Sequence, residues 1–385
     1  MDPSLIPATN LTHVFYYFAS IDATTYKVWH HTQGTGGVSA YAMLYLGHLL
    51  QSTLQWTLLR VSTFNTGNPC SPLTPYLFSL PSQVVPSNPA VDVTQNLYLR
   101  FNSALKAANP AIKTLLSIGE PSDGNTTFAN AASSTSSRSA FESAITLART
   151  YNFDGLDVAW GYPEGNAALF SALLTDFRAA IESETALSGK PKLLLSAVVS
   201  DSPDIIRAYD VLTLNKTLDF VNVVTYDLHG PWEAKTGMQT ALEDLSDPQL
   251  SLKGAMAAWV SRGLDRSKAM LGLAMYGNTW TLASTSSTGV GAAATGTGQA
   301  GSINQEPGIL FYKEIDQLVT TGGYTATLDA PISSMYAVKG DQWVGYDDPS
   351  TITTKVQFAK AQGYGGWALG QDANNALLNA SAAAA

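Results

Sequence analysis

The sequence predicts an α/β fold built on a parallel sheet, and two patterns along the chain carry this prediction. Short, continuous apolar runs alternate with helical patterns from about residue 92 onward. Strands buried on both faces are apolar throughout, and alternation of strand and helix is typical of parallel sheets. With an earlier run near the N-terminus there are seven such strands. We expect either a (β/α)8 barrel with one strand unaccounted for or an open doubly wound sheet. No glycine-rich phosphate loop follows any strand, which disfavours a nucleotide-binding sheet.

The strands are expected at seven apolar runs: His13–Ala19, Lys113–Gly119, Asp154–Trp160, Lys192–Val199, Asp219–Asp227, Ala269–Met275 and Gly366–Leu369. Helices are expected between them, where apolar residues recur every three or four positions. The apolar stripes of these helices begin at Leu97, Phe141, Leu169, Leu252 and Ile352. Pro110, Gly263 and Gly363 follow three of the stripes, as is typical of residues that end helices.

Two stretches interrupt this alternation. Residues 281–342 hold a tract rich in Gly, Ala, Ser and Thr, one helical pattern and short β-like pieces. They predict a small α+β insertion between the last two barrel strands. Residues 30–91 have no clear period and are too long for an ordinary loop, so we treat them as an atypical insert. The barrel is therefore assigned to residues 1–29, 92–280 and 343–385.

Composition excludes several kinds of partner. Apolar residues make up 45% of the chain, enough for a large core. The net charge of −9, without a basic run, repels phosphate backbones, so we expect no nucleic-acid partner. Cys70 is the only cysteine, which excludes an internal disulfide and a cysteine-rich metal site. His13 and His229 have no partners at metal-ligand spacing, so we expect no metal and no cofactor.

The sequence also bears on membranes and compartment. No segment reaches the roughly 18 uninterrupted apolar residues of a membrane span. Met1 to Thr12 contain no basic region followed by an apolar stretch, so we expect no secretory signal in this chain. Sequons for N-glycosylation, which matter only on the secretory route, stand at Asn10, Asn125, Asn215 and Asn379.

The most informative stretch is DGLDVAWGYP, Asp154–Pro163. It resembles the motif of glycoside hydrolase family 18, the chitinases, and most closely the plant class V chitinases. The family motif is Asp, two residues, Asp, one residue, Asp, one residue, Glu, then Tyr-Pro. Further resembling blocks are VNVVTYDLHGPW (Val221–Trp232), LGLAMYGNTW (Leu271–Trp280) and GYGGWALGQD (Gly363–Asp372). The resemblance implies a TIM barrel, endo-chitinase activity in the family, and an extracellular or vacuolar location.

The chain departs from the motif at two positions. Gly161 stands where the family has the Glu that protonates the glycosidic oxygen, and Ala159 where it has the Asp that orients the substrate's N-acetyl group. Because alternate strand residues face the same side, positions 157, 159 and 161 should all point to the barrel mouth. General acid catalysis alone is worth about 10²–10⁴-fold. No catalytic set is therefore intact: only Asp154 and Asp157 of the motif remain, and Glu164 lies past the turn.

The resemblance also implies sugar-binding residues at the carboxyl ends of the strands. Trp367 aligns with the aromatic floor beneath a sugar ring, and Tyr226 with Asp227 corresponds to a pair that contacts the acetamido group and the sugar. Tyr276 and Trp280 either line the site or pack in the core, and Tyr162 belongs to the motif itself. Trp160 has the opposite strand parity, so it should face the helices.

The first strand of the family has no counterpart before His13. Either part of residues 30–91 fills the gap, or the barrel has an open seam with unpaired edges. Three hypotheses follow. The chain is a monomeric chitinase-like protein that cannot hydrolyse chitin but binds chitin or N-acetylglucosamine oligosaccharides in a groove at the barrel mouth. Alternatively, it is a weakly active or altered carbohydrate hydrolase, or a degenerate, non-functional gene product.

Overall fold

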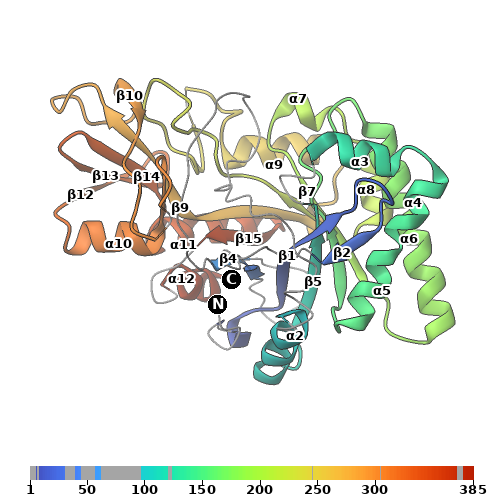
Figure 1. Ribbon diagram of the computed structural model, residues 1–385. Helices are drawn as coiled ribbons and strands as arrows, with labels where there is room; N and C mark the ends of the chain where they lie inside the picture. Colours follow the sequence, from blue (N-terminus) through green and yellow to red (C-terminus); the bar gives the residue numbers. More distant parts are fainter. Residues whose placement is uncertain are drawn as a thin grey trace.

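The computed structural model describes residues 6, 8–30, 40–44, 57–61, 97–119, 124–244, 246–303, 305–370 and 376–385, and it confirms the barrel (Figure 1). Its strands pair in the order β1, β5, β6, β7, β8, β9, β15 and β3, and β3 pairs again with β1. They span His13–Ile21 (β1), Lys113–Ile118 (β5), Gly155–Val158 (β6), Leu194–Val199 (β7), Phe220–Val223 (β8), Ala269–Leu282 (β9), Gly365–Gly370 (β15) and Ala40–Leu44 (β3). All seven strands expected from the sequence are present.

The eighth position is held by β3, which lies between β1 and β15 and is antiparallel to both. Leu44 pairs with Val14 on one side and with Ala368 on the other. On the edge of β3 that faces β15, the remaining residues, Ala40 to Met43, pair with β4 (Thr57–Val61). Part of residues 30–91 therefore fills the gap left by the missing first strand, and the seam is occupied at these positions. The other residues of that predicted insert, apart from His30, lie outside the described ones.

The helices pack against the outer faces of the barrel strands, with α3 to α6 and α8 beside β5–β7 (right in Figure 1). They span Leu97–Ala108 (α2), Gly124–Ala132 (α3), Thr135–Phe141 (α4), Ser143–Thr150 (α5), Ala167–Ser188 (α6), Pro203–Ile206 (α7), Val211–Thr217 (α8), Leu252–Ser261 (α9), Pro349–Gln362 (α11) and Ala376–Ala384 (α12). Where one helical stripe was expected from Phe141, two helices meet at Glu142. Asp348 caps the amino end of α11 and Gly363, at φ 75°, ends it.

Strand parity separates the barrel interior from the helix layer. The interior is filled by apolar and aromatic side chains: Phe15, Leu115, Val198, Phe220, Val224, Tyr226, Met270, Ala274 and Tyr276. Trp160 instead stacks on Phe128 of α3, with ring centroids 5.1 Å apart, and donates from Nε1 to Asn125 at 2.7 Å. Trp160 therefore faces the helices, as its parity predicts.

A second group of strands continues from the barrel through β9, which is 14 residues long. Residues 269–275 of β9 bond the barrel neighbours, and Tyr276–Leu282 bond β10 (Ala294–Thr297), β11 (Ile309–Phe311) and β14 (Gln342–Tyr346). The remaining members are β12 (Thr325–Asp329), β13 (Ser334–Lys339) and helix α10 (Tyr312–Thr320), at the left in Figure 1. β2 (Val28–His30) pairs with β1. The division of the chain into domains stays a prediction.

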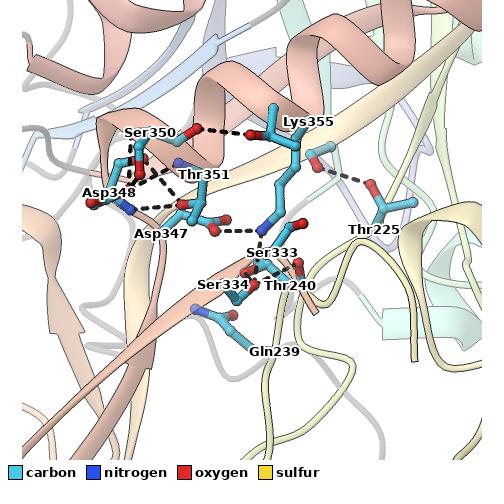
Figure 2. Close-up of polar contacts among 12 residues, drawn as sticks. Thr225, Gln239, Thr240, Ser333, Ser334, Asp347, Asp348, Ser350, Thr351 and Lys355 are labelled. Carbon is cyan, nitrogen blue, oxygen red and sulfur yellow. Dashed lines mark hydrogen bonds and ion pairs between the residues drawn. The ribbon is translucent and has the colours of Figure 1, made fainter. Parts of the chain in front are cut away.

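A fully buried ion pair joins this second sheet to the barrel helices (Figure 2). Lys355 of α11 donates to Asp347, which follows β14, and to Ser334 of β13 at 3.0 Å. Ser334 in turn donates to the carbonyl of Thr240 at 3.1 Å, in the segment between β8 and α9. The ammonium group of Lys355 thus joins β13, the residue after β14 and α11, and Ser334 extends the network to the segment before α9. Among the described residues, no helix is both long and apolar enough to cross a bilayer.

Candidate functional site

Five partly exposed residues follow the carboxyl ends of three neighbouring barrel strands. Ala159, Gly161 and Tyr162 follow β6, Asp201 follows β7, and Asp227 follows β8. Because β6, β7 and β8 are parallel and adjacent, these residues lie at the same rim of the barrel. The rim residues stand above the tyrosines of the barrel interior, so this end of the barrel is the candidate site.

Asp157 of β6 lies beneath this rim and is completely buried. Its carboxylate accepts hydrogen bonds from Ser117 of β5 and Ser196 of β7, each at 2.6 Å, and from Asn222 of β8 at 3.2 Å. Burial raises the pKa of Asp157 to about 6, although the three hydrogen bonds work against this shift. All three partners are neutral, so the group is a carboxyl without a countercharge.

We expect the burial of Asp157 to make the protein less stable above pH 6 than near pH 4. The folded state holds this proton more tightly than the unfolded chain, whose Asp pKa is about 3.9, so stability falls as pH rises from about 4 to about 6. Asp157→Asn should remove a penalty of roughly 3 kcal/mol at neutral pH. Urea denaturation from pH 4 to 7 measures the difference between variant and parent. Asp210→Asn is the control, because Asp210 caps α8 with a lowered pKa and Asn also caps helices. A difference that does not grow with pH would contradict the expectation.

Asp227 is held by residues of β9 and of the loop after β8. Asn278 donates to Oδ1 of Asp227 at 3.1 Å and to the carbonyl of His229 at 2.9 Å. Gln239 donates to the carbonyl of Tyr276 at 2.7 Å, and Tyr276 hydrogen-bonds Asp227. Burial raises the pKa of Asp227 despite these bonds. The structure therefore brings Asp227 and Tyr276 together, with the ring of Tyr226 6.1 Å from that of Tyr276.

Tyr162 and Asp201 complete the electrostatics of the rim. Burial raises the pKa of Tyr162, and the nearby Asp201, Tyr209, Tyr226 and Asp227 add to the shift. The pKa of Asp201 is raised to about 7, chiefly by burial and secondly by the charge of Asp227. Near neutral pH the carboxyl of Asp201 is therefore partly protonated, so it can donate as well as accept a hydrogen bond.

Three of the site residues expected from the sequence lie elsewhere or are only partly described. Asp154 is at the opposite end of β6, where Lys106 pairs with it at 2.9 Å and the backbone of Thr114 donates to it. Trp280 is completely buried against Trp343 of β14, with centroids 5.2 Å apart, so it has no exposed face for a ligand. The backbone of Trp367 lies in β15, paired with Gly272, but its side chain is outside the described part of the structure.

The two altered motif positions determine the chemistry of the rim. Ala159 packs with the barrel-interior residues and its amide bonds the carbonyl of Ile118 at 2.9 Å. Gly161 precedes Tyr162 through a cis peptide bond. Neither position can donate a proton or hold an amide group through a side chain, so the rim has no acid at the family position. Among the described residues no group of three His, Cys, Asp or Glu is arranged to hold a metal ion.

Sequence reasoning missed two rim features. Trp232, in the loop after β8, keeps 57% of its surface exposed. The other large hydrophobic side chains exposed in the described part of the chain are aliphatic. It is the last residue of the block Val221–Trp232 and directly follows Gly230-Pro231. A Gly-Pro pair is typical of a turn, and this signal could have identified Trp232 as an exposed loop residue. Asp201 carries no motif signal, because only the pairing of β7 with β8 brings it near Asp227.

The fold and the rim define a TIM-barrel protein whose candidate site lies at the carboxyl ends of the strands. The sequence profile of glycosyl hydrolases family 18 matches residues 2–372, and the chain belongs to that family. A class V chitinase of Arabidopsis thaliana is 36% identical over 298 residues, which cover 75% of this chain and 77% of that protein.

Two further relatives show the range of the similarity. Human (Homo sapiens) chitinase-3-like protein 2 is 39% identical over 289 residues, covering 72% of this chain and 73% of the relative. A crystal structure of a Glu-to-Gln mutant of class V chitinase from Nicotiana tobaccum, in complex with NAG4, superimposes with a TM-score of 0.79. It is 26% identical and covers 100% of this chain and 95% of that chain. The resemblance drawn from the sequence motifs is therefore confirmed.

Proposed function

We propose that the protein is a chitinase-like member of family 18 that binds N-acetylglucosamine oligomers at the barrel mouth without hydrolysing them. The observation that carries this proposal is the pair Ala159 and Gly161 at the rim, beside an otherwise retained set of polar and aromatic residues. Tyr162, Asp201 and Asp227 offer hydrogen-bonding groups that a ligand can reach. We place the protein in the extracellular or vacuolar space, as its resemblance to the class V chitinases implies.

One comparison supports sugar binding by a related protein in which a glutamate is replaced. The tobacco chitinase was solved with NAG4 as a Glu-to-Gln mutant, so that protein holds the tetramer although a glutamate is replaced. The human relative is named as chitinase-like. Hydrogen bonds to hydroxyl and amide groups, together with aromatic faces against sugar rings, need no proton transfer. We propose a monomer as the binding form.

A second candidate is an altered hydrolase that uses Asp201 as its acid. The observation favouring it is that the carboxyl of Asp201, with a pKa of about 7, is available as a proton donor near neutral pH one strand away from Gly161. Any turnover of the parent protein that Asp201→Asn abolishes would support this candidate over the first.

We expect the purified protein to bind the N-acetylglucosamine tetramer and to release no shorter sugars from it. Isothermal titration calorimetry and a product assay on the same sample measure both. A saturating ligand at 100 times its Kd should stabilise the fold by about 2.7 kcal/mol, which a thermal melt detects. Asp227→Ala should weaken binding roughly ten- to a hundredfold, since it removes an ionisable hydrogen-bonding partner. Asp154→Asn, at the other end of β6, is the control and should leave Kd unchanged. Absence of binding would reject the proposal.

A further inference from the structure

The loop after β8 carries Trp232 on a short turn that is tied at both ends. The amide of Glu233 donates to the carbonyl of Gly230 at 2.9 Å, which closes the turn. Asn278 of β9 holds the carbonyl of His229 at 2.9 Å, and through its second bond the carboxyl of Asp227 at 3.1 Å. The turn is therefore connected through Asn278 to Asp227 of the candidate site.

The indole of Trp232 lies against the turn that carries it. A Cβ atom placed on Gly230 would meet the ring carbons of Trp232 at 2.0 and 2.1 Å. On the next residue, Pro231 approaches Gly308, where an added Cβ would lie 3.0 Å from the proline ring. Only the absence of a side chain at Gly230 allows the ring to pack here. The ring is thus supported from behind while more than half of its surface faces solvent.

His229 holds this turn from the other side. Its Nδ1 lies 3.0 and 3.1 Å from the two carboxylate oxygens of Glu233, and its Nε2 lies 3.8 Å from Asp244. The imidazole packs against Gly237, where a Cβ would lie 2.5 Å from it. His229 therefore sits between two carboxylates, one in the turn and one in the segment before α9, with a neutral backbone wall behind it.

We propose that His229 is a positioning residue for Trp232. Clamped between Glu233 and Asp244, it fixes the turn so that the indole forms a platform for a ring of an N-acetylglucosamine oligomer, and it couples that binding to pH. The inference rests on the proposed function, because the platform matters only if the barrel mouth takes such sugars. The ligand itself is neutral, so the pH dependence comes from the protein.

The direction of the pH effect follows from the partners of His229. A neutral imidazole donates from one nitrogen, and the protonated form donates from both. The hydrogen bond to Glu233 is the main cause that raises the pKa of His229 above 6.5, against the effect of burial, and the charges of Glu233 and Asp244 add to it. The clamp is complete below the ordinary histidine pKa. As pH rises through the raised value, the imidazole loses its charge and one of its two N–H donors, so the clamp is weakened.

The test is the Kd for the N-acetylglucosamine tetramer from pH 5.5 to 9, measured by calorimetry. The parent protein should bind about three- to tenfold more weakly at the high end, as the fraction of correctly positioned Trp232 falls. His229→Gln should bind with one affinity throughout, close to that of the parent at high pH. Gly230→Ala should weaken binding at every pH, because it displaces the indole while leaving His229 in place. Since Asp201 titrates in the same range, each protein is also measured with Asp201→Asn.

A second measurement needs no ligand. The fluorescence of Trp232 is obtained as the part of the indole emission that Trp232→Ala removes. Quenching of this emission by acrylamide should rise with pH in the parent protein and stay constant in His229→Gln. If parent and His229→Gln lose affinity in parallel with pH, the inference fails while sugar binding stands. If no tetramer binds at any pH, the proposed function fails. In that case the quenching measurement still decides the positioning role of His229. The role is overturned if His229→Gln shows the same pH-dependent quenching as the parent, and it is retained if the quenching of His229→Gln no longer depends on pH.

Discussion

Restoring both altered motif positions, Ala159→Asp together with Gly161→Glu, is expected to convert the binding protein into a chitin-oligomer hydrolase. A glutamate at position 161 supplies the proton for the leaving oxygen, and an aspartate at position 159 orients the acetamido group that attacks. The two groups act on one transition state, so the double variant should exceed the sum of the single variants. We expect an increase of at least about 10²-fold over either single variant, the lower value for general acid catalysis. Release of shorter oligomers from the tetramer measures it.

The matched control replaces the same positions with amides, Ala159→Asn and Gly161→Gln. These side chains have nearly the same size as the carboxylic acids but cannot transfer a proton, so the control should bind the tetramer and leave it intact. Full activity from Gly161→Glu alone would show that position 159 does not matter here. An inactive double variant that still binds the tetramer would show that the barrel mouth differs from the family in more than these two side chains.

Breaking the buried ion pair between Lys355 and Asp347 is expected to cause the largest loss of stability. Lys355→Met leaves the Asp347 carboxylate without its charge partner, and Oδ2 of that group already accepts no hydrogen bond from the part of the chain that the structure describes. Removing one member of a buried pair costs about 3–5 kcal/mol. The midpoint of thermal unfolding should fall by roughly 4–6 °C in a chain of this size. Differential scanning calorimetry and urea denaturation measure the change.

Two further variants identify the cause of that loss. Lys355→Met combined with Asp347→Leu removes both charges, and it should recover most of the lost stability because hydrophobic replacements of buried pairs are often neutral. Lys253→Met breaks the half-exposed pair with Glu243, and it should cost no more than about 1 kcal/mol. Equal losses for Lys355→Met and Lys253→Met would contradict the proposed importance of burial.

The sequence predicted the seven parallel strands because each is apolar on both faces, which sets them apart from their surroundings. It could not predict β3, whose five residues AYAML lie in a stretch without periodic context. The barrel neighbours of β3 are β1, which precedes it, and β15, which follows more than 300 residues later, and no local pattern reports such a pairing. Closure of the barrel is decided by tertiary pairing rather than by propensity.

At the site, strand parity was sufficient to place Trp160 outside and Ala159 inside the barrel. Parity failed to distinguish Trp280 from a ligand-facing residue, because β9 continues past the barrel into the second sheet, where Trp343 covers the indole. The exposure of Trp232 depends on a turn that folds the ring onto Gly230. Contacts of that kind join residues through their three-dimensional packing, and apolar character alone cannot separate an exposed tryptophan from a buried one.

The antiparallel direction of β3 has a consequence for how such barrels change over time. Seven strands run toward the mouth and deliver their carboxyl-terminal residues to it, whereas β3 runs away from it and delivers Ala40, its first residue. Backbone hydrogen bonding can close the ring with either chain polarity, because both orientations pair donors and acceptors along the strand. The architecture therefore constrains the number of strands more strictly than their direction or ancestry. A closing strand of opposite direction also leaves β6, β7 and β8 parallel, so the rim residues that follow them keep their common edge.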